Sequence, residues 1–343
     1  MIALANIFGF LFQFLVLAVI AHSKGIIFLG EYSLVLSMIS PFCIVFSLGL
    51  KNRYFSGGLD FTEIKPIVGM RNVFFMVVIF LALLSIIYGG YACAIALLVK
   101  AFEIYVDSLI VFKTGFFNVI FTPILCACVL VLGVFNPVCL YVFIPVLVVL
   151  YFWRNLSFSF SGLVVIDGFK YSNILFYQNL AVMVQRMMFA SFFGYSVLAI
   201  VTVLSYFFVI TTLVTQSIYY QFVGRGLSFV LRIIIALWVL LILPYFSLAD
   251  YFTSTLFLVS VGVETLLVVY VGVLIVSLDV YYYYARVQSG SYSYFYLALI
   301  SLAALLLFSI VNPGHEFEVM VNIVLMYLVR LALNLFMYKK VIR

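Results

Sequence analysis

Long, uninterrupted apolar runs are the feature of this sequence that most constrains its fold. They recur along the whole chain at roughly 18 to 23 residues, the length that carries an α-helix across about 30 Å of hydrocarbon. With 68% hydrophobic and only 8% charged residues, the chain has too little polar side chain to cover a globule in water. We therefore expect an all-α, polytopic membrane protein.

Apolar windows and the polar breaks between them predict about twelve transmembrane helices. A polar stretch at the midpoint divides them six and six, which predicts two six-helix bundles, at residues 1–155 and 174–343, joined by a cytoplasmic loop at 156–173. A second long cytoplasmic loop is expected at Lys51 to Asn72. The predicted helices are Ala3 to Ala21, Ile27 to Leu50, Val73 to Tyr88, Tyr91 to Phe112, Phe116 to Phe135, Val138 to Trp153, Ile174 to Phe193, Val197 to Tyr219, Leu227 to Leu248, Leu256 to Leu278, Tyr294 to Val311 and Val319 to Tyr338.

Basic residues divide unequally between the two faces that these helices define. If both termini are cytoplasmic, thirteen of the 17 Lys and Arg residues lie in cytoplasmic loops or in the tail, Arg71 among them. The opposite face holds only Lys24, and the other three lie within predicted helices. This asymmetry follows the positive-inside rule and predicts an even number of spans with cytoplasmic N- and C-termini. It also assigns the surplus positive charge to topology, which excludes a basic nucleic-acid-binding face.

Basic and amide side chains inside predicted helices are the candidate substrate-binding residues. A charge at the bilayer centre costs about 2.5 to 3.5 kcal/mol, so such residues usually face a water-filled cavity or one another. Arg186 and Gln185 lie near the middle of the seventh predicted helix, Lys100 in the fourth, and Arg330 with Asn334 in the twelfth. Guanidinium and ammonium groups suit a phosphate or another anionic headgroup. The structural alternative for Arg330 is that it extends toward the membrane interface.

Acidic side chains in the same segments are the candidate ion-coupling residues. Glu103 and Asp107 share one stripe of the fourth predicted helix with Lys100, and Glu264 lies in the tenth. Carboxylates there would take up a proton or Na⁺ and couple transport to an ion gradient. The structural alternatives are an i, i+3 pair of Lys100 with Glu103, an interfacial Asp107, and a Glu264 capped by hydroxyl groups.

Other residue types carry no predicted chemistry. The five cysteines all lie in apolar runs and the chain has only two histidines, so we predict no metal site, no cofactor and no catalytic residues. The run Tyr281 to Tyr284, just beyond the tenth predicted helix, is interpreted as an interfacial aromatic belt, with a binding site as the alternative. Four prolines within predicted helices favour kinks: Pro41, Pro123, Pro145 and Pro244.

The second predicted helix carries a resemblance to a known family. Its residues Gly30-Glu31-Tyr32-Ser33-Leu34, Ser40-Pro41 and Ser47-Leu48-Gly49-Leu50-Lys51 resemble the lipid-linked oligosaccharide flippases of the multidrug/oligosaccharidyl-lipid/polysaccharide exporter superfamily. The stretch from Lys100 to Asp107 and Arg186 are similar in character. The sequence departs from the family in its short length, in lacking a basic segment before the first helix, and in having Val184-Gln185 before Arg186 where a proline often stands.

The resemblance implies a function and a location. It implies a flippase that moves undecaprenyl-pyrophosphate-linked oligosaccharide repeat units across the bacterial inner membrane by alternating access, for O-antigen or capsular polysaccharide synthesis. The expected partners are this lipid-linked oligosaccharide, the bilayer, the polysaccharide polymerase and the chain-length regulator. Two alternatives stay open: the O-antigen polymerase itself, which the short outer loops disfavour, and a drug or cation exporter of the same superfamily.

Overall fold

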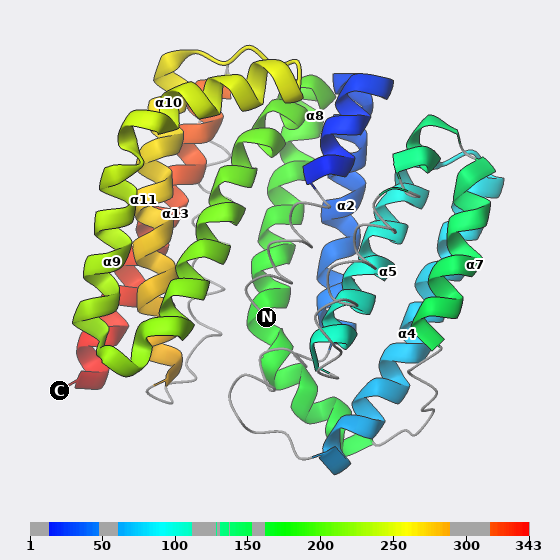
Figure 1. Ribbon diagram of the computed structural model, residues 1–343, viewed down its shortest axis with the longest axis horizontal. Coiled ribbons are helices and arrows are strands. Elements are labelled where there is room, and N and C mark those ends of the chain that lie inside the picture. The colour runs from blue at the N-terminus through cyan, green and yellow to red at the C-terminus, as the bar shows by residue number, and fades with distance from the viewer. Residues whose placement is uncertain are drawn as a thin grey trace. The chain divides into compact units, whose positions relative to one another are not determined.

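The computed structural model describes residues 14–47, 61–111, 128, 131–136, 138–152, 162–288 and 316–342. Within these ranges the regular structure is helical and no strand forms, which confirms the predicted all-α class. A helix at Phe14–Lys24 precedes the others. The elements labelled in part in Figure 1 are α2 (Ile26–Ser47), α4 (Phe61–Ile87), α5 (Tyr91–Val111), α7 (Val138–Phe152), α8 (Gly162–Phe222), the 3₁₀ turn η1 (Val223–Arg225), α9 (Leu227–Leu240), α10 (Ile242–Tyr251), the π-helical turn η2 (Phe252–Leu256), α11 (Val263–Gln288) and α13 (Glu316–Ile342).

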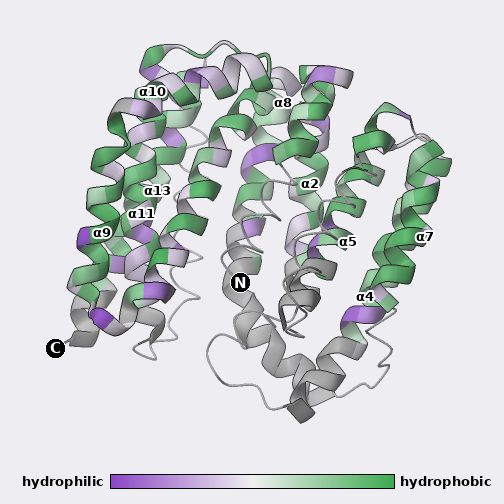
Figure 2. Cartoon of the chain, in the orientation of Figure 1, coloured by the Kyte–Doolittle hydropathy of each residue, from purple (hydrophilic) through white to green (hydrophobic). Residues whose placement is uncertain are grey.

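Several of these helices are long and apolar enough to cross a membrane. Hydrophobic residues dominate these helices, and Figure 2 shows that the shorter helix α7, which is not one of them, is also apolar along nearly its whole length. Within the described residues there are five such segments, or six if the bent pair α9–α10 forms one span. The predicted helix Tyr294 to Val311 and most of Phe116 to Phe135 lie outside the described residues, so twelve helices in two bundles stays a prediction. The five segments are Ile26–Cys43, Gly69–Ile87, Val182–Tyr219, Val263–Ala285 and Glu316–Phe336.

The chain divides into two compact units, which we call unit 1 (Met1–Met183) and unit 2 (Val184–Arg343). In unit 1, α5 packs against both α2 and α4. Fully buried alanines lie on both sides of α5: Ala94 and Ala101 share one side, and Ala96 lies on the other. Small side chains let helix backbones approach closely where the lipid supplies no hydrophobic driving force. The buried alanines therefore explain how α5 can pack closely against both α2 and α4.

In unit 2, α11 packs along α13. Gly272 makes the close approach possible, because a Cβ built there would lie 2.7 Å from the ring of Phe208 and 2.7 Å from a methyl group of Val324. Two tyrosines of α11 bind α9 as well: the hydroxyl of Tyr270 donates to the carbonyl of Trp238 at 2.7 Å, and that of Tyr281 donates to Leu227 at 2.9 Å. Polar groups of α11 thus hold α9 at two points along its length.

Two predicted helix boundaries coincide with glycines in the left-handed region of backbone space. Gly89 (φ 76°) separates α4 from α5, as the Gly89-Gly90 break predicts. Gly194 (φ 81°, ψ 175°) interrupts α8 where the sequence predicts the end of one helix at Phe193 and the start of the next at Val197. At about 1.5 Å per residue, the apolar part of α8 is also far longer than the ~30 Å that one crossing needs. The interruption at Gly194 therefore makes α8 two helices.

The ninth predicted helix, Leu227 to Leu248, begins at the predicted residue but does not continue as one rod. α9 ends at Leu240, and the helical segments on either side of the break are bent by 68°. Pro244 explains the position of the bend, because its ring nitrogen carries no hydrogen to donate to the carbonyl of Leu240 one turn earlier. By contrast, α2 and α7 continue past Pro41 and Pro145.

Other predicted boundaries are wrong. α4 begins at Phe61 and α8 at Gly162, so both predicted cytoplasmic loops are partly helical. The tenth predicted helix is displaced, since α11 runs over Val263–Gln288 rather than from Leu256 to Leu278. The run Tyr281 to Tyr284 therefore lies inside α11 and not beyond it, and Tyr281 is buried. Hydropathy identifies the apolar part of a helix, whereas the backbone hydrogen bonds of α4, α8 and the end of α11 continue through polar residues.

Arg71 is the clearest consequence of this error. The sequence placed it in a cytoplasmic loop, but it lies inside α4 and is only 1% exposed. Its guanidinium Nη2 donates to the backbone carbonyl of Ile104 in α5 at 2.8 Å. The side chain is therefore part of the packing between α4 and α5.

Candidate functional site

The most buried carboxylate among the described residues with an ion pair is that of Asp279, in α11. Its residue is 0% exposed and lies in an apolar segment of the helix. A charge in such a place is stable only when it is paired and hydrogen-bonded. Asp279 is therefore the residue around which a polar site in unit 2 is built.

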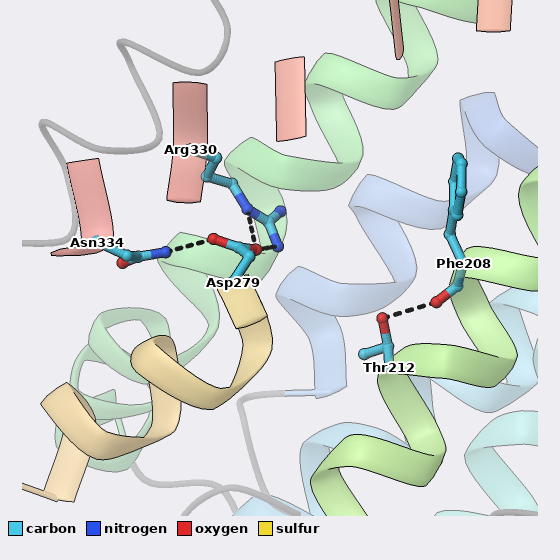
Figure 3. Close-up of polar contacts among 5 residues, drawn as sticks. All are labelled: Phe208, Thr212, Asp279, Arg330 and Asn334. Carbon is cyan, nitrogen blue, oxygen red and sulfur yellow. Dashed lines mark hydrogen bonds and ion pairs between the residues drawn. The ribbon is translucent and has the colours of Figure 1, made fainter. Parts of the chain in front are cut away.

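Two residues of α13 bind this carboxylate from one side. The guanidinium of Arg330 donates to Oδ2 through Nε at 2.6 Å and also through Nη2, and the amide of Asn334 donates to Oδ1 at 2.6 Å. Figure 3 shows Asp279 between Arg330 and Asn334. Positions 330 and 334 are one helical turn apart, so their side chains lie on the same face of α13. Both carboxylate oxygens are thus satisfied by one neighbouring helix.

Tyr327 extends the site by another turn of α13. The Cζ atom of Arg330 lies 5.0 Å from the centre of its ring, within cation–π range, and the ring of Phe208 meets it edge-on at 5.5 Å. The charged groups that act electrostatically on its hydroxyl are those of Arg330, Asp279 and Arg186. We refer to Asp279, Arg330, Asn334 and Tyr327 as the Asp279 cluster, with Arg186 of α8 nearby.

The structure therefore brings two predicted substrate-binding residues into one neighbourhood. Arg330 is a member of the Asp279 cluster, and Arg186 is close enough to interact with Tyr327. Gln185, the residue beside Arg186, is buried, with 7% of its surface exposed. Arg330 forms an ion pair with Asp279, whereas its structural alternative had it extend toward the membrane interface.

The other predicted site residues do not join this neighbourhood. Lys100 and Glu103 form an ion pair within α5, with Nζ 2.8 Å from one carboxylate oxygen and 3.0 Å from the other. This is the i, i+3 pairing that the sequence offered as an alternative to function. Glu264 is exposed in the first turn of α11, not in the middle of a helix. Asp107 lies in α5, but its side chain is outside the described residues.

Sequence reasoning missed Asp279 because the tenth helix was predicted to end at Leu278, one residue before it. A signal was nevertheless present in the twelfth predicted helix. Arg330 and Asn334 are spaced i, i+4 on a single face, and two polar groups on one face of an apolar helix need a polar partner on the helix that they contact. Asp279 lies one residue beyond the predicted end of the tenth helix, and only Glu316 and Glu318 are acidic residues between it and Arg330 in the sequence.

The Asp279 cluster holds a paired and hydrogen-bonded charge inside an apolar helix pair. Within the described ranges, no group of three or more His, Cys, Asp or Glu side chains is arranged to hold a metal ion. The interactions that the described residues of the cluster make are ion pairing, hydrogen bonding and a cation–π contact.

Helical structure, several membrane-length apolar helices and a buried ion pair define the class: this is a helical, membrane-embedded protein. Comparison with known proteins does not assign the chain to a family. No family model matches the sequence, and no curated protein or solved structure is significantly similar to it.

Proposed function

We propose that the protein is a membrane transporter of an anionic, lipid-linked substrate, and specifically a flippase for undecaprenyl-pyrophosphate-linked oligosaccharide repeat units. It accepts the substrate from the cytoplasmic leaflet of the bacterial inner membrane and releases it to the outer leaflet by alternating access. The lipid tail stays in the bilayer while the pyrophosphate and sugars pass through the protein. No covalent step is needed.

The observation that carries the proposal is the buried ion pair of Asp279 with Arg330 inside unit 2. Arg186 is a second arginine within an apolar helical segment of this unit. Burying charge in an apolar helix is costly and is tolerated mainly where it serves a pathway for a substrate or an ion. An excess of guanidinium over carboxylate favours an anionic substrate, because guanidinium groups match the oxygen geometry of phosphates.

A second feature supports transport rather than a rigid anchor. The α9–α10 pair is bent by 68° at a proline, and η2 follows it as a π-helical turn. Interrupted helices and π-helical turns are frequent at the sites of transporters, where they form binding groups and hinges. Ion coupling by a carboxylate remains part of the proposal, with Asp279 joining Glu103, Asp107 and Glu264 as candidates.

The test is deletion of the gene in the native bacterium, followed by extraction of undecaprenyl-linked intermediates and complementation. Wild type and Arg232→Ala, an exposed arginine on α9, are expected to clear single repeat units that accumulate on the cytoplasmic face. Arg186→Ala is expected to leave them there. If single units reach the outer face and only chain lengthening fails, the protein is the polymerase. If the intermediates do not change at all, the flippase proposal is refuted and a drug or cation exporter becomes the better hypothesis.

A further inference from the structure

Arg71 is an arginine whose burial the Asp279 cluster does not explain. It lies in α4, within the apolar segment Gly69–Ile87 of unit 1, and it is among the largest fully buried side chains of the described residues. The positive-inside rule expects such a residue at the cytoplasmic surface. Its enclosure between helices therefore requires a compensating interaction.

The interactions that Arg71 makes within the chain are insufficient. Nη2 donates to the carbonyl of Ile104 at 2.8 Å, but Nε and Nη1 are buried and have no hydrogen-bond partner in the described part of the chain. A guanidinium has five N–H donors, and Nε and Nη1 together carry three of them. A backbone carbonyl also supplies no negative charge. Leaving a buried cation without a counter-charge costs more than leaving out an ordinary hydrogen bond.

The nearest described acidic residue in α5 is already engaged. Ile104 directly follows Glu103, whose carboxylate is bound at both oxygens by Lys100. Among the described side chains of α4 and α5, Arg71, Lys100 and Glu103 carry two positive charges and one negative charge. One turn along α4 from Arg71, the ring of Phe75 stacks on Tyr151 with centroids 3.9 Å apart, which closes that side with apolar surface. These described side chains leave the positive charge of Arg71 without a described counter-charge.

We propose that Arg71 is a binding residue for a phosphate group that enters from outside the chain. A phosphate supplies both the missing negative charge and several acceptor oxygens for Nε and Nη1. Arg71 is enclosed in this structure, so the phosphate reaches it in a conformation in which α4 and α5 part, and binding is coupled to the packing of these two helices. This inference deepens the proposed flippase function and rests on it for the identity of the substrate, whose pyrophosphate has the same chemistry.

The test measures thermal unfolding of the full-length protein in phosphatidylcholine nanodiscs, with and without inorganic phosphate at constant ionic strength. We expect phosphate to raise the unfolding midpoint of wild type and of Arg232→Gln by about 3 °C or more, and that of Arg71→Gln by less than about 1 °C. Without phosphate, Arg71→Gln should unfold at the same temperature as wild type or higher, because the variant no longer buries an unpaired charge. A purely structural Arg71 gives the opposite order, with Arg71→Gln less stable by the same amount in both conditions.

Nanodiscs that contain phosphatidylglycerol distinguish the two sources of phosphate. If they stabilise wild type relative to Arg71→Gln without added salt, the group bound is a lipid headgroup; if only inorganic phosphate does so, it is a free anion. Either result supports the site. A wild-type midpoint that neither phosphate source raises overturns it, and this measurement holds even if Arg71→Gln fails to fold. The unfolding assay measures phosphate binding and not transport. Its failure would therefore not refute the flippase proposal. Normal lipid-linked intermediates in the deletion strain would refute the flippase proposal but not phosphate binding at Arg71.

Discussion

The ion pair at Asp279 makes a quantitative prediction about the stability of unit 2. Replacing Asp279 with Asn keeps the shape of the side chain but removes its charge, and leaves Arg330 without a counter-ion. Breaking a buried pair by removing one partner typically costs about 3 to 5 kcal/mol. Arg330 keeps 19% of its side-chain surface exposed and contacts the ring of Tyr327. We therefore expect the lower end of that range, a loss of about 3 kcal/mol in the free energy of unfolding.

A double-mutant cycle separates the pair from its surroundings. Because Arg330 is the residue left unpaired in Asp279→Asn, Arg330→Gln in the same protein should recover much of the loss, with a coupling energy of about 2 kcal/mol. Thr212→Val is the matched control: the hydroxyl of Thr212 donates to the carbonyl of Phe208 at 2.9 Å within one helix, as Figure 3 also shows, and bears no charge. Its loss should cost less than about 1.5 kcal/mol.

The assay is reversible unfolding of the purified protein in mixed micelles by titration with denaturing detergent. Trp238 in α9 is one of only two tryptophans in the chain, and its fluorescence reports on unit 2. If the costs of Asp279→Asn and Arg330→Gln simply add, to within about 0.5 kcal/mol, the ion pair does not stabilise the helix pair and the reasoning is refuted.

Three further predictions concern packing, bending and a local pair. Gly272→Ala should destabilise unit 2 by about 1 to 3 kcal/mol, because its new methyl group overlaps neighbouring side chains, whereas Gly262→Ala meets no atom within 4 Å and should cost much less in the same unfolding assay. Pro244→Ala restores a backbone N–H and should reduce the 68° bend, measured as a longer distance between spin labels placed on α9 and α10; an unchanged distance would show that packing sets the bend. Glu103→Gln should lower unfolding free energy by less than about 1 kcal/mol, because the Lys100 pair is partly exposed and local; a larger loss would indicate that this carboxylate has another essential partner.

The sequence predicts the helical class and several helix boundaries well, because these depend on local chemistry. Gly89 and Gly194 end helices where the apolar windows break, and Leu227 begins α9 as predicted. The same windows fail where a helix continues through polar residues. Arg71 was assigned to a loop for this reason, although the hydrogen-bonded backbone of α4 extends past it in both directions.

The candidate site shows the same division between local and long-range information. Arg330 was recognised as a charge within a helix, since that needs only its neighbours in sequence. Its partner Asp279 is 51 residues earlier, and no periodicity connects the two. Pairing between helices depends on their register and rotation, which packing at residues such as Gly272 determines. A sequence read one helix at a time contains no measure of that register.

The separation of Asp279 from Arg330 also bears on how the protein is made. At roughly 5 to 20 residues per second, about 3 to 10 s of synthesis pass between Asp279 and Arg330, which follows it by 51 residues. During that interval its ion-pair partner Arg330 has not yet been made, and an unpaired aspartate at the centre of a membrane helix costs about 2.5 to 3.5 kcal/mol to insert. We therefore expect α11 to remain beside the insertion machinery until α13 emerges, so that the two helices enter the bilayer together. A chain truncated before α13 would then lose the stable insertion of α11 as well.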